Sequence, residues 1–506
     1  MISDLRINTI SMKILSKSRF VSGIQCEKKL WFDYYRKDLK LPTDERTQAV
    51  FDLGNRIGIL AQHMFPNGKD ATPANYANLG PSIQNTKEWI SENAETIYEA
   101  TFSTPNAFCM LDILHRREDE LWAIEVKNST QVKDYHLTDA SLQYFVMKNA
   151  GFAPDRFYLM HINNLYIKQG EITSEIFHLE DITEAVLENQ GWVAENLERL
   201  LKIAAIEDEP MVKIGGHCSS PFGCDYHHHC WQHVPENSVF ELYRGGKKGW
   251  NLYEQGVFKI SDIADDFPLS HFQSLQRNGL LHQQKHFNDE AIKSIIGSWE
   301  FPLYFFDFET VFPAIPVYDG TRPYQQVPFQ YSLHILDEDC NLTHKEFLAN
   351  PEDFSNGENP LKQMVEQLKN DFGSIGNIVT YNQSFEKGRL NDLAQSFPED
   401  VAFLHNLTAR IVDLLPVFQG GHCYFPEMKN SASIKSVLPA IAPHFTYGNL
   451  EIQDGGSASS MFHQSIESGK FIDANLRKNL LKYCERDTLA MVIIYQFLKK
   501  RIDGFE

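Results

Sequence analysis

The stretch that decides the fold of the C-terminal half is WEFPLYFFDFETV, residues 299–311. As an extended strand it is apolar on both faces up to Phe306, which is typical of a central strand in a sheet covered on both sides. Asp307 and Glu309 end the strand and share one face, because they are two residues apart. Paired carboxylates there can bind two divalent ions, Mg²⁺ or Mn²⁺, that activate water and stabilise a leaving oxygen. The stretch therefore predicts a sheet domain with a metal site at the end of its central strand.

Two further acids are expected from later segments. Residues 378–394, IVTYNQSFEKGRLNDLA, are typical of a strand followed by a helix, with Glu386 early in the helix. Residues 479–500, NLLKYCERDTLAMVIIYQFLKK, predict a strongly periodic helix on which Tyr483 and Asp487 lie one turn apart on one face. A tyrosine one turn before a metal-binding aspartate can orient the attacking water.

These three motifs, DFET, YNxxFE and YxxxD, resemble the DEDD exonucleases of the ribonuclease-H-like (DnaQ) superfamily, in the branch that carries a tyrosine. The resemblance spans about residues 301–500 and implies 3′–5′ exonuclease activity. It implies Asp307, Glu309, Glu386 and Asp487 as metal ligands, with Tyr483 orienting water. The third acid of that superfamily is usually aspartate, and this chain has glutamate there.

A polar segment between the motifs, KNSASIKSVLPAI, is typical of a loop entering a helix. It places Ser433 and Lys435 where they can contact a phosphate backbone, and a surface turn is an equally good interpretation.

A second candidate centre lies in residues 107–130, AFCMLDILHRREDELWAIEVKNST. The alternation predicts two strands joined by a charged turn. Glu125 and Lys127 then share one strand face, with Asp112 on the neighbouring strand. Two carboxylates can hold Mg²⁺ against a phosphodiester, and the lysine can position water or offset developing charge. A polar strand face exposed to solvent gives the same pattern.

The following segment, residues 132–151, predicts an amphipathic helix from which Gln143 can reach this centre. His63, on a predicted helix upstream, is a further candidate metal ligand, although packing is the commoner role of such a histidine. Together these residues resemble the PD-(D/E)xK nucleases of the RecB type. The family often has tyrosine four positions after the glutamine, where this chain has Met147.

Three cysteines, Cys218, Cys224 and Cys230, lie in CSSPFGCDYHHHC. RecB-type nucleases with a bound cluster, including AddB subunits, add one cysteine from the N-terminus, and Cys26 matches it. The resemblance implies a [4Fe–4S] cluster that ties the two ends of the domain together. Zinc is the alternative, because a Cys₃His site can be completed by one of the nearby histidines, His217, His227, His228, His229 or His233. The other cysteines, Cys109, Cys340, Cys423 and Cys484, are expected to pack.

The chain has 506 residues and a net charge of −20, which argues against coating nucleic acid through bulk electrostatics. It has no apolar stretch long enough to span a membrane and no secretory signal at its start, so we expect a cytoplasmic protein. The expected fold is α/β and multidomain. Residues 1–235 are expected to form a PD-(D/E)xK restriction-endonuclease-like domain with the cluster. Residues 236–300 are expected to form a helical connector, and 301–506 a ribonuclease-H-like domain.

From end to end the chain resembles a bacterial family that fuses a RecB/AddB-like nuclease bearing an iron–sulfur cluster to a DnaQ-like exonuclease. We therefore expect a Mg²⁺- or Mn²⁺-dependent nuclease with two centres, acting on single-stranded DNA in repair or defence. The alternative is a protein that binds or senses nucleic acid, with one or both centres inactive. A redox enzyme is a weaker third interpretation, because the sequence has no nucleotide-cofactor fingerprint.

Overall fold

The computed structural model describes residues 13–356, 359–445, 447–448, 450–468 and 472–504. Both helices and strands run through the chain, which divides into two compact α/β units. Unit 1 takes in the described residues up to Tyr166 together with Ile172–His233. Unit 2 takes in Ile167–Glu171 and the described residues from Val234 onward. The residues expected to form a separate helical connector, 236–300, thus lie within unit 2.

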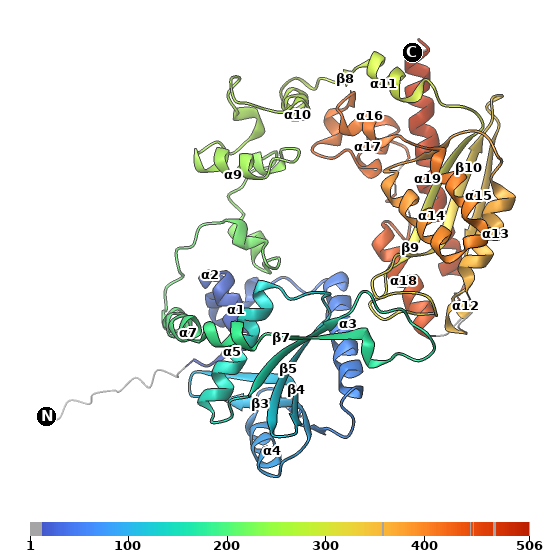
Figure 1. The fold of residues 1–506 in the computed structure, drawn as a ribbon. Coiled ribbons are helices and arrows are strands. Elements are labelled where there is room, and N and C mark those ends of the chain that lie inside the picture. Colours follow the sequence, from blue (N-terminus) through green and yellow to red (C-terminus); the bar gives the residue numbers. More distant parts are fainter. Residues whose placement is uncertain (1–12, 357–358, 446, 449, 469–471, 505–506) are drawn as a thin grey trace. The chain divides into compact units, whose positions relative to one another are not determined.

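Unit 1 is built on a mixed sheet of order β2-β3-β4-β5-β6-β7, in which β1 also pairs with β4. Strands β3, β4, β5 and β7 of this sheet are labelled in Figure 1. Strands β3, β4 and β5 are antiparallel, β5 and β6 are parallel, and β6 and β7 are antiparallel. The strands are β1 (Leu15–Ser16), β2 (Lys69–Asp70), β3 (Thr96–Ser103), β4 (Ala107–Arg117), β5 (Glu120–Lys127), β6 (Arg156–Ile162) and β7 (Phe177–Asp181).

The parallel pair β5 and β6 requires a crossover, and the helix α5 supplies it and packs against β4, α1 and α7. The two strands predicted for residues 107–130 are β4 and β5, and the helix predicted to follow them is α5. It was expected to be amphipathic, but it is buried on most sides, with seven buried residues in the run from Asp139 to Val146. The helices of unit 1 are α1 (Lys17–Gln25), α2 (Glu27–Tyr35), α3 (Glu45–His63), α4 (Gly80–Ser91), α5 (Asp134–Asn149), α6 (Thr183–Glu188), α7 (Gln190–Ala205) and α8 (His227–Cys230).

Unit 2 contains a five-stranded sheet of order β11-β10-β9-β12-β13. The central strand β9 pairs antiparallel with β10 and parallel with β12. A small second sheet pairs β8 (His286–Phe287) with β14 (Cys423–Tyr424). The strands of the main sheet are β9 (Leu303–Val311), β10 (Val327–Leu336), β11 (Leu342–Leu348), β12 (Ile378–Thr380) and β13 (Ile411–Asp413).

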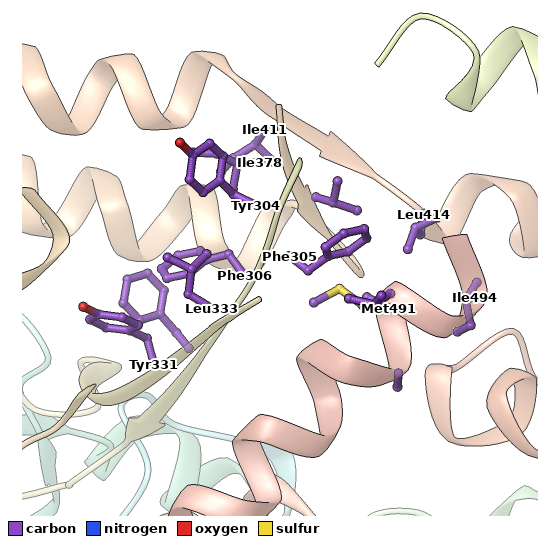
Figure 2. Close-up of a cluster of buried hydrophobic side chains, with 14 of the residues drawn as sticks. Tyr304, Phe305, Phe306, Tyr331, Leu333, Ile378, Ile411, Leu414, Met491 and Ile494 are labelled. Atoms are coloured by element: carbon purple, nitrogen blue, oxygen red, sulfur yellow. The ribbon is translucent and has the colours of Figure 1, made fainter. Parts of the chain in front are cut away.

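The sheet of unit 2 is covered on both faces, as the apolar run before Asp307 predicts. Figure 2 shows Phe305 of β9 beside Met491 on one side of the sheet, whereas Phe306 and Leu333 lie on the other. The helices of unit 2 are α9 (Lys247–Glu254), α10 (His271–His282), α11 (Asp289–Ile296), α12 (Pro351–Ser355), α13 (Pro360–Asp371), α14 (Ser384–Ser396), α15 (Val401–Ala409), α16 (Leu415–Gln419), α17 (Ile434–Ile441), α18 (Gly455–Ser468) and α19 (Ala474–Ile502).

The helix α19 packs against β9 and β10 and so faces the acidic end of the central strand. It begins after Asp473, whose carboxylate accepts a hydrogen bond from the Leu476 amide at 2.8 Å and caps the helix. No helix in the described part of the chain has the length and apolar character needed to cross a bilayer.

Of the four cysteines expected to pack, Cys109, Cys423 and Cys484 are buried. The expectation for Cys340 was wrong, because it is exposed in the turn between β10 and β11. A polar turn of the sequence Asp-Cys-Asn surrounds it, and its positive φ of 65° belongs to that turn.

Candidate active centres and cysteine cluster

Four acidic side chains of unit 2 converge at the end of β9. Asp307 and Glu309 lie on the face of β9 that carries Phe305, toward α19, and Asp487 lies on α19 itself. Glu386 comes from the first turn of α14, and its carboxyl group shares a hydrogen bond with that of Asp307. The structure thus brings together all four acids that the sequence predicts for this centre.

Burial and mutual repulsion shift these acids toward their protonated forms. Burial, followed by the charges of Asp487 and Glu309, raises the pKa of Asp307 well above its usual range. Burial and Asp487 raise the pKa of Glu309 to about 8, and burial with Asp413 raises the pKa of Glu386 to about 8. A group of buried carboxylates with too few cations to neutralise it is a candidate site for divalent metal ions.

Two more observations fit a metal in this place. Oε2 of Glu386 is buried and has no hydrogen-bond partner, which leaves an acceptor to be satisfied. Ligand atoms of Asp307, Glu309 and Cys484 lie within 4.8 Å of one another. The oxygen donors suit Mg²⁺ or Mn²⁺.

Two features of neighbouring strands position these acids. Asp413, at the end of β13, accepts hydrogen bonds from the amides of Asn382 and Gln383 at 2.9 and 3.0 Å, which fixes the start of α14 and hence Glu386. The strand β10 has a register irregularity between Pro328 and Gln330, opposite Glu309. Such bulges redirect side chains and are frequent beside active sites.

Two tyrosines contact Asp487. The predicted one, Tyr483, forms a hydrogen bond to it, and Tyr447 donates a second to Oδ1 at 2.5 Å. Burial and Asp487 raise the pKa of both phenols well above their usual range, so both remain donors. Sequence reasoning missed Tyr447, because it lies in a loop with no motif spacing that relates it to α19.

Lys435 is a cation close to these tyrosines. Its Nζ atom lies 5.5 Å from the ring centre of Tyr447 and 5.4 Å from that of Tyr483, and it donates to the Gln453 carbonyl at 2.8 Å. Its positive charge lowers the pKa of Glu309 and so offsets part of the increase that burial and Asp487 cause. Ser433 precedes the first turn of α17 and is exposed.

Cys484 was expected only to pack, and the structure places it in the acidic centre. Its Sγ lies 3.9 Å from Oδ2 of Asp307. Cys484 precedes Asp487 by three residues on α19, so both side chains project toward the same group of acids.

The raised pKa values of this centre predict a pH-dependent stability of the metal-free chain. Glu309 and Glu386 titrate near pH 8 in the folded chain and near 4.5 when unfolded, so the folded state holds protons that the unfolded chain releases. The free energy of unfolding should therefore fall as pH rises from about 4.5 to 8. Thermal unfolding with EDTA should show a Tm lower at pH 8 than at pH 5.5 by at least about 4 °C, equivalent to roughly 1–2 kcal/mol.

Millimolar Mg²⁺ at pH 8 should restore this stability, because a bound cation replaces the protons. A Glu309→Gln/Glu386→Gln variant should show a smaller pH effect and a smaller response to Mg²⁺. An equal response in this variant and in wild type would contradict the assignment.

In unit 1 the predicted centre assembles around Glu125. Its carboxylate is 1% exposed, and Oε1 accepts hydrogen bonds from Lys127 and Lys17, each at 2.6 Å. Burial opposes ionisation, but the two ammonium groups outweigh it and hold the pKa of Glu125 well below its usual range. Oε2 accepts a hydrogen bond from Gln143 at 2.7 Å, so the predicted glutamine reaches the centre.

Asp112 lies on β4 and accepts a hydrogen bond from the Val126 amide at 2.6 Å. The register of Ile113 with Ile124 places Asp112 opposite Glu125. Burial and then Glu125 raise the pKa of Asp112 to about 7. Lys17 and Lys127 also lower the pKa of Asp112, but here burial and the charge of Glu125 have the larger effect.

Three residues of this centre were missed. Glu99 on β3 lies in the left-handed region at φ +52° and has a pKa of about 8, raised by burial, Asp112 and Glu125. Backbone strain at a non-glycine residue is concentrated at functional sites. Lys17 and Asp139 complete the network, with Lys127 bound to Asp139 at 2.7 Å.

Sequence spacing gives no signal for Lys17, because its segment reaches β4 through tertiary contacts of α1 and through the pairing of β1. Asp139 could have been predicted from the sequence, since it precedes Gln143 by one helical turn and therefore lies on the same helix face.

His63 behaves differently from the other predicted ligands. It is exposed in the last turn of α3, and in the described part of the chain no hydrogen bond or ion pair joins it to Asp112 or Glu125.

The four predicted cysteines lie together in unit 1 and line one pocket. Burial raises the pKa of each of Cys26, Cys224 and Cys230, that of Cys224 to about 11. Neighbouring sulfurs raise these pKa values further. Cys218 raises the pKa of Cys26, and Cys218 and Cys26 together raise that of Cys230.

Backbone groups and lysines are arranged around these sulfurs. The amides of Lys28 and Lys29 donate to the Cys26 sulfur, and the amide of Tyr226 donates to that of Cys224. Gln25 donates to two carbonyls of the later loop, that of His217 at 2.8 Å and that of Phe222 at 2.7 Å. Amide donors and nearby cations stabilise thiolates, as a bound metal or cluster requires.

The histidines that could complete a zinc site are spread around this pocket. His217 and His227 line it, and the ring of His227 stacks on Trp231 with ring centres 4.5 Å apart. His229 packs edge-on against Phe32, and His228 and His233 are exposed. In the described residues, the groups whose ligand atoms all lie within 4.8 Å of one another do not include the four cysteines.

Comparisons with known proteins find partial matches. Residues 304–433, which include Asp307, Glu309 and Glu386, match a family model described as "Domain of unknown function (DUF2779)". The solved structure titled "Crystal structure of SSO0001" matches with 12% identity and a TM-score of 0.21, covering 40% of this chain and 79% of that one.

Three curated relatives come from mycoplasmas and ureaplasmas. "Uncharacterized protein MG366" of Mycoplasma genitalium is 28% identical over 221 residues, or 39% of this chain and 32% of that protein. Its homolog in Mycoplasma pneumoniae is 28% identical over 215 residues, 38% and 32% of the two chains. "Uncharacterized protein UU173" of Ureaplasma parvum is 29% identical over 226 residues, 39% and 31%. The chain matches about a third of the length of these relatives.

Proposed function

We propose that this chain is a metal-dependent nuclease whose C-terminal centre removes nucleotides from 3′ ends, single-stranded DNA being the expected substrate. The observation that carries the proposal is the convergence of Asp307, Glu309, Glu386 and Asp487, from three separate segments, into one buried group of carboxyls with raised pKa values. Burying several acidic groups together destabilises the folded chain, unless a bound cation compensates for their repulsion and loss of hydration.

Divalent ions bound by these carboxylates would activate water and stabilise the leaving oxygen of a phosphodiester. Tyr483 and Tyr447 stay protonated beside Asp487, so they act as hydrogen-bond donors that hold its carboxylate and the attacking water in place. Lys435 carries a positive charge at the exposed side of this centre and can contact the phosphate backbone. On this proposal, unit 2 is a ribonuclease-H-like exonuclease domain.

The N-terminal centre is proposed as a second, PD-(D/E)xK-type nuclease site. Asp112, Glu125 and the unpredicted Glu99 are the candidate ligands for Mg²⁺ or Mn²⁺. Lys127, held by Glu125 and Asp139, is placed to offset developing negative charge, and Gln143 fixes the orientation of Glu125.

One observation favours the alternative of a binding or sensing role for this centre. Lys17 and Lys127 together neutralise Glu125, so one of the two predicted acids is already paired with cations. Whether this centre is active is therefore tested with a circular substrate, which has no 3′ end for the C-terminal centre to attack.

The cysteine pocket is proposed to hold a [4Fe–4S] cluster as a structural clasp between the start of unit 1 and the loop after α7. Four thiols, amide donors to two of them and flanking lysines fit such a group. Zinc would require sulfurs about 3.8 Å apart, given Zn–S bonds of about 2.3 Å in a tetrahedron. Among the described residues, the groups whose ligand atoms all lie within 4.8 Å of one another do not include these cysteines, and a wider spacing of sulfurs suits the larger group.

The proposal is tested with 5′-labelled single- and double-stranded DNA and RNA, incubated with Mg²⁺ or Mn²⁺ under anaerobic conditions. We expect a ladder of progressively shorter labelled products from single-stranded DNA, and no products with EDTA. If every substrate stays intact with both metals, the binding or sensing role replaces the nuclease.

Circular single-stranded DNA isolates the N-terminal centre, because it offers no 3′ end. Wild type should linearise it, whereas Glu125→Gln should not. Equal linearisation by both proteins would remove Glu125 from the proposed centre.

A further inference from the structure

Three side chains on neighbouring strands of unit 1 bring metal-binding atoms together outside the centres described above. Their ligand atoms, from His161, His178 and Glu180, all lie within 4.8 Å of one another. His161 on β6 pairs directly with His178 on β7, so both side chains project from one face of the sheet. Glu180 follows two residues later on β7 and therefore shares that face.

The hydrogen bonding of His161 defines which of its ring nitrogens is available. Nδ1 lies 3.2 Å from the carbonyl oxygen of Ile162, which can only accept, so Nδ1 carries the hydrogen and donates it. In the neutral imidazole Nε2 then keeps a free lone pair. Metal-binding histidines usually donate their other ring N–H to a backbone carbonyl or carboxylate, as His161 does.

The lone pair of His161 faces a second acceptor. Nε2 lies 3.4 Å from Oε2 of Glu180, and in the neutral ring with the hydrogen on Nδ1 neither of these two atoms has a hydrogen to donate. Zinc bound tetrahedrally at about 2.1 Å from nitrogen and oxygen ligands would separate those ligands by about 3.4 Å. The observed separation is therefore the one that a shared metal ion produces.

We propose that His161, His178 and Glu180 bind a divalent transition-metal ion, with zinc as the preferred ion. Two imidazoles and one carboxylate suit zinc, whereas Mg²⁺ and Ca²⁺ prefer ligand sets made of oxygen alone. Three protein ligands leave one tetrahedral position for water or an anionic oxygen of a substrate. The ion can enter from solvent, because β7 is an edge strand and both His178 and Glu180 are exposed.

The site adjoins the N-terminal centre. His161 pairs with Lys127 in the parallel ladder of β5 and β6, so the two side chains lie on the same sheet face. A zinc ion here would place a second positive charge beside that of Lys127. Zinc binding itself does not rest on the nuclease proposal, and it can be measured without any activity.

The test is zinc binding to the full chain, purified anaerobically with its cysteine site loaded. Zinc per chain is measured by mass spectrometry after dialysis against micromolar ZnCl₂, and affinity by calorimetric titration. The variants are His178→Ala and Glu180→Gln, both at exposed positions, with His405→Ala as the control, an exposed histidine on α15 of unit 2.

Wild type and His405→Ala should each hold one zinc ion more than His178→Ala, and Glu180→Gln should bind zinc at least about tenfold more weakly than wild type. Cobalt in place of zinc should give visible absorption bands that His178→Ala lacks. The same zinc content and affinity in all four proteins would overturn the proposal, and so would loss of zinc in His405→Ala alone. Unchanged thermal unfolding of His178→Ala without zinc establishes that it is folded.

Discussion

Asp307→Asn is expected to lower the rate of 3′-end removal by about a thousandfold and to raise the Tm of the metal-free chain at the same time. Asparagine has nearly the same shape but cannot supply the charge that binds and orients a divalent ion. Losing about 4 kcal/mol of transition-state stabilisation corresponds to that factor. Rates are measured on a 5′-labelled single strand at saturating Mg²⁺.

The rise in stability has a separate cause. Burial and the charges of Asp487 and Glu309 raise the pKa of Asp307, so the folded chain must take up a proton or tolerate repulsion at pH 7. Asparagine removes that requirement and should stabilise the metal-free chain by at least about 1 kcal/mol. Denaturant unfolding in EDTA measures the gain, and added Mg²⁺ should stabilise wild type more than the variant.

Asp339→Asn is the control, because Asp339 is an exposed aspartate of the same unit in the turn before β11. It should leave both the rate and the Tm as in wild type. If Asp307→Asn digests 3′ ends as fast as wild type, the exonuclease centre is wrongly placed. If it loses activity and also unfolds more easily in EDTA, Asp307 has a structural role and the metal-site interpretation fails.

The second large effect is expected from Cys26→Ser, which should abolish the brown colour and the absorption near 400 nm of anaerobically purified protein. Iron should fall from about four ions per chain to less than one. Cys26 lies between α1 and α2, and its partners lie far later in the sequence. A crosslink that closes a loop of roughly 190 residues stabilises by about 5 kcal/mol, so unit 1 should lose stability of that order.

Cys340→Ser is the matched control, because Cys340 is exposed and belongs to unit 2. It should keep the colour, the iron content and the unfolding midpoint of wild type. A colourless wild-type protein that carries one zinc ion per chain would replace the cluster with zinc. If wild type contains neither iron nor zinc, the four cysteines are reduced thiols that bind no metal, and the cluster proposal is wrong.

The local elements of both centres could be predicted because each has a distinct period. Alternation in residues 107–127 predicts β4 and β5, and the apolar run before Asp307 predicts the covered strand β9. The 3.6-residue period of α19 places Tyr483 and Asp487 on one face. Each of these patterns involves only neighbouring residues, so it can be recognised without knowing the rest of the structure.

Residues that join the centres from irregular segments could not be predicted in this way. Tyr447 reaches Asp487 from a loop, and Lys17 reaches Glu125 across more than a hundred residues of sequence. Glu99 was missed because its strand shows no charge pattern, and only its unusual backbone conformation marks it. Conversely, His63 occupies the predicted helix but is exposed at its end.

By itself, the sequence determined which residue types were available and on which strand or helix face each one lies. It determined the elements around the motifs, which are β4, β5, α5, β9, β12, α14 and α19, and the acids at the end of β9, because hydrophobic periodicity acts over a few residues. Only the tertiary structure decided which faces meet: two lysines around Glu125, two tyrosines on Asp487, and two histidines with a glutamate at the edge of the sheet. The reason is physical, since electrostatics and burial depend on distances in space, and sequence spacing fixes those distances only within one element.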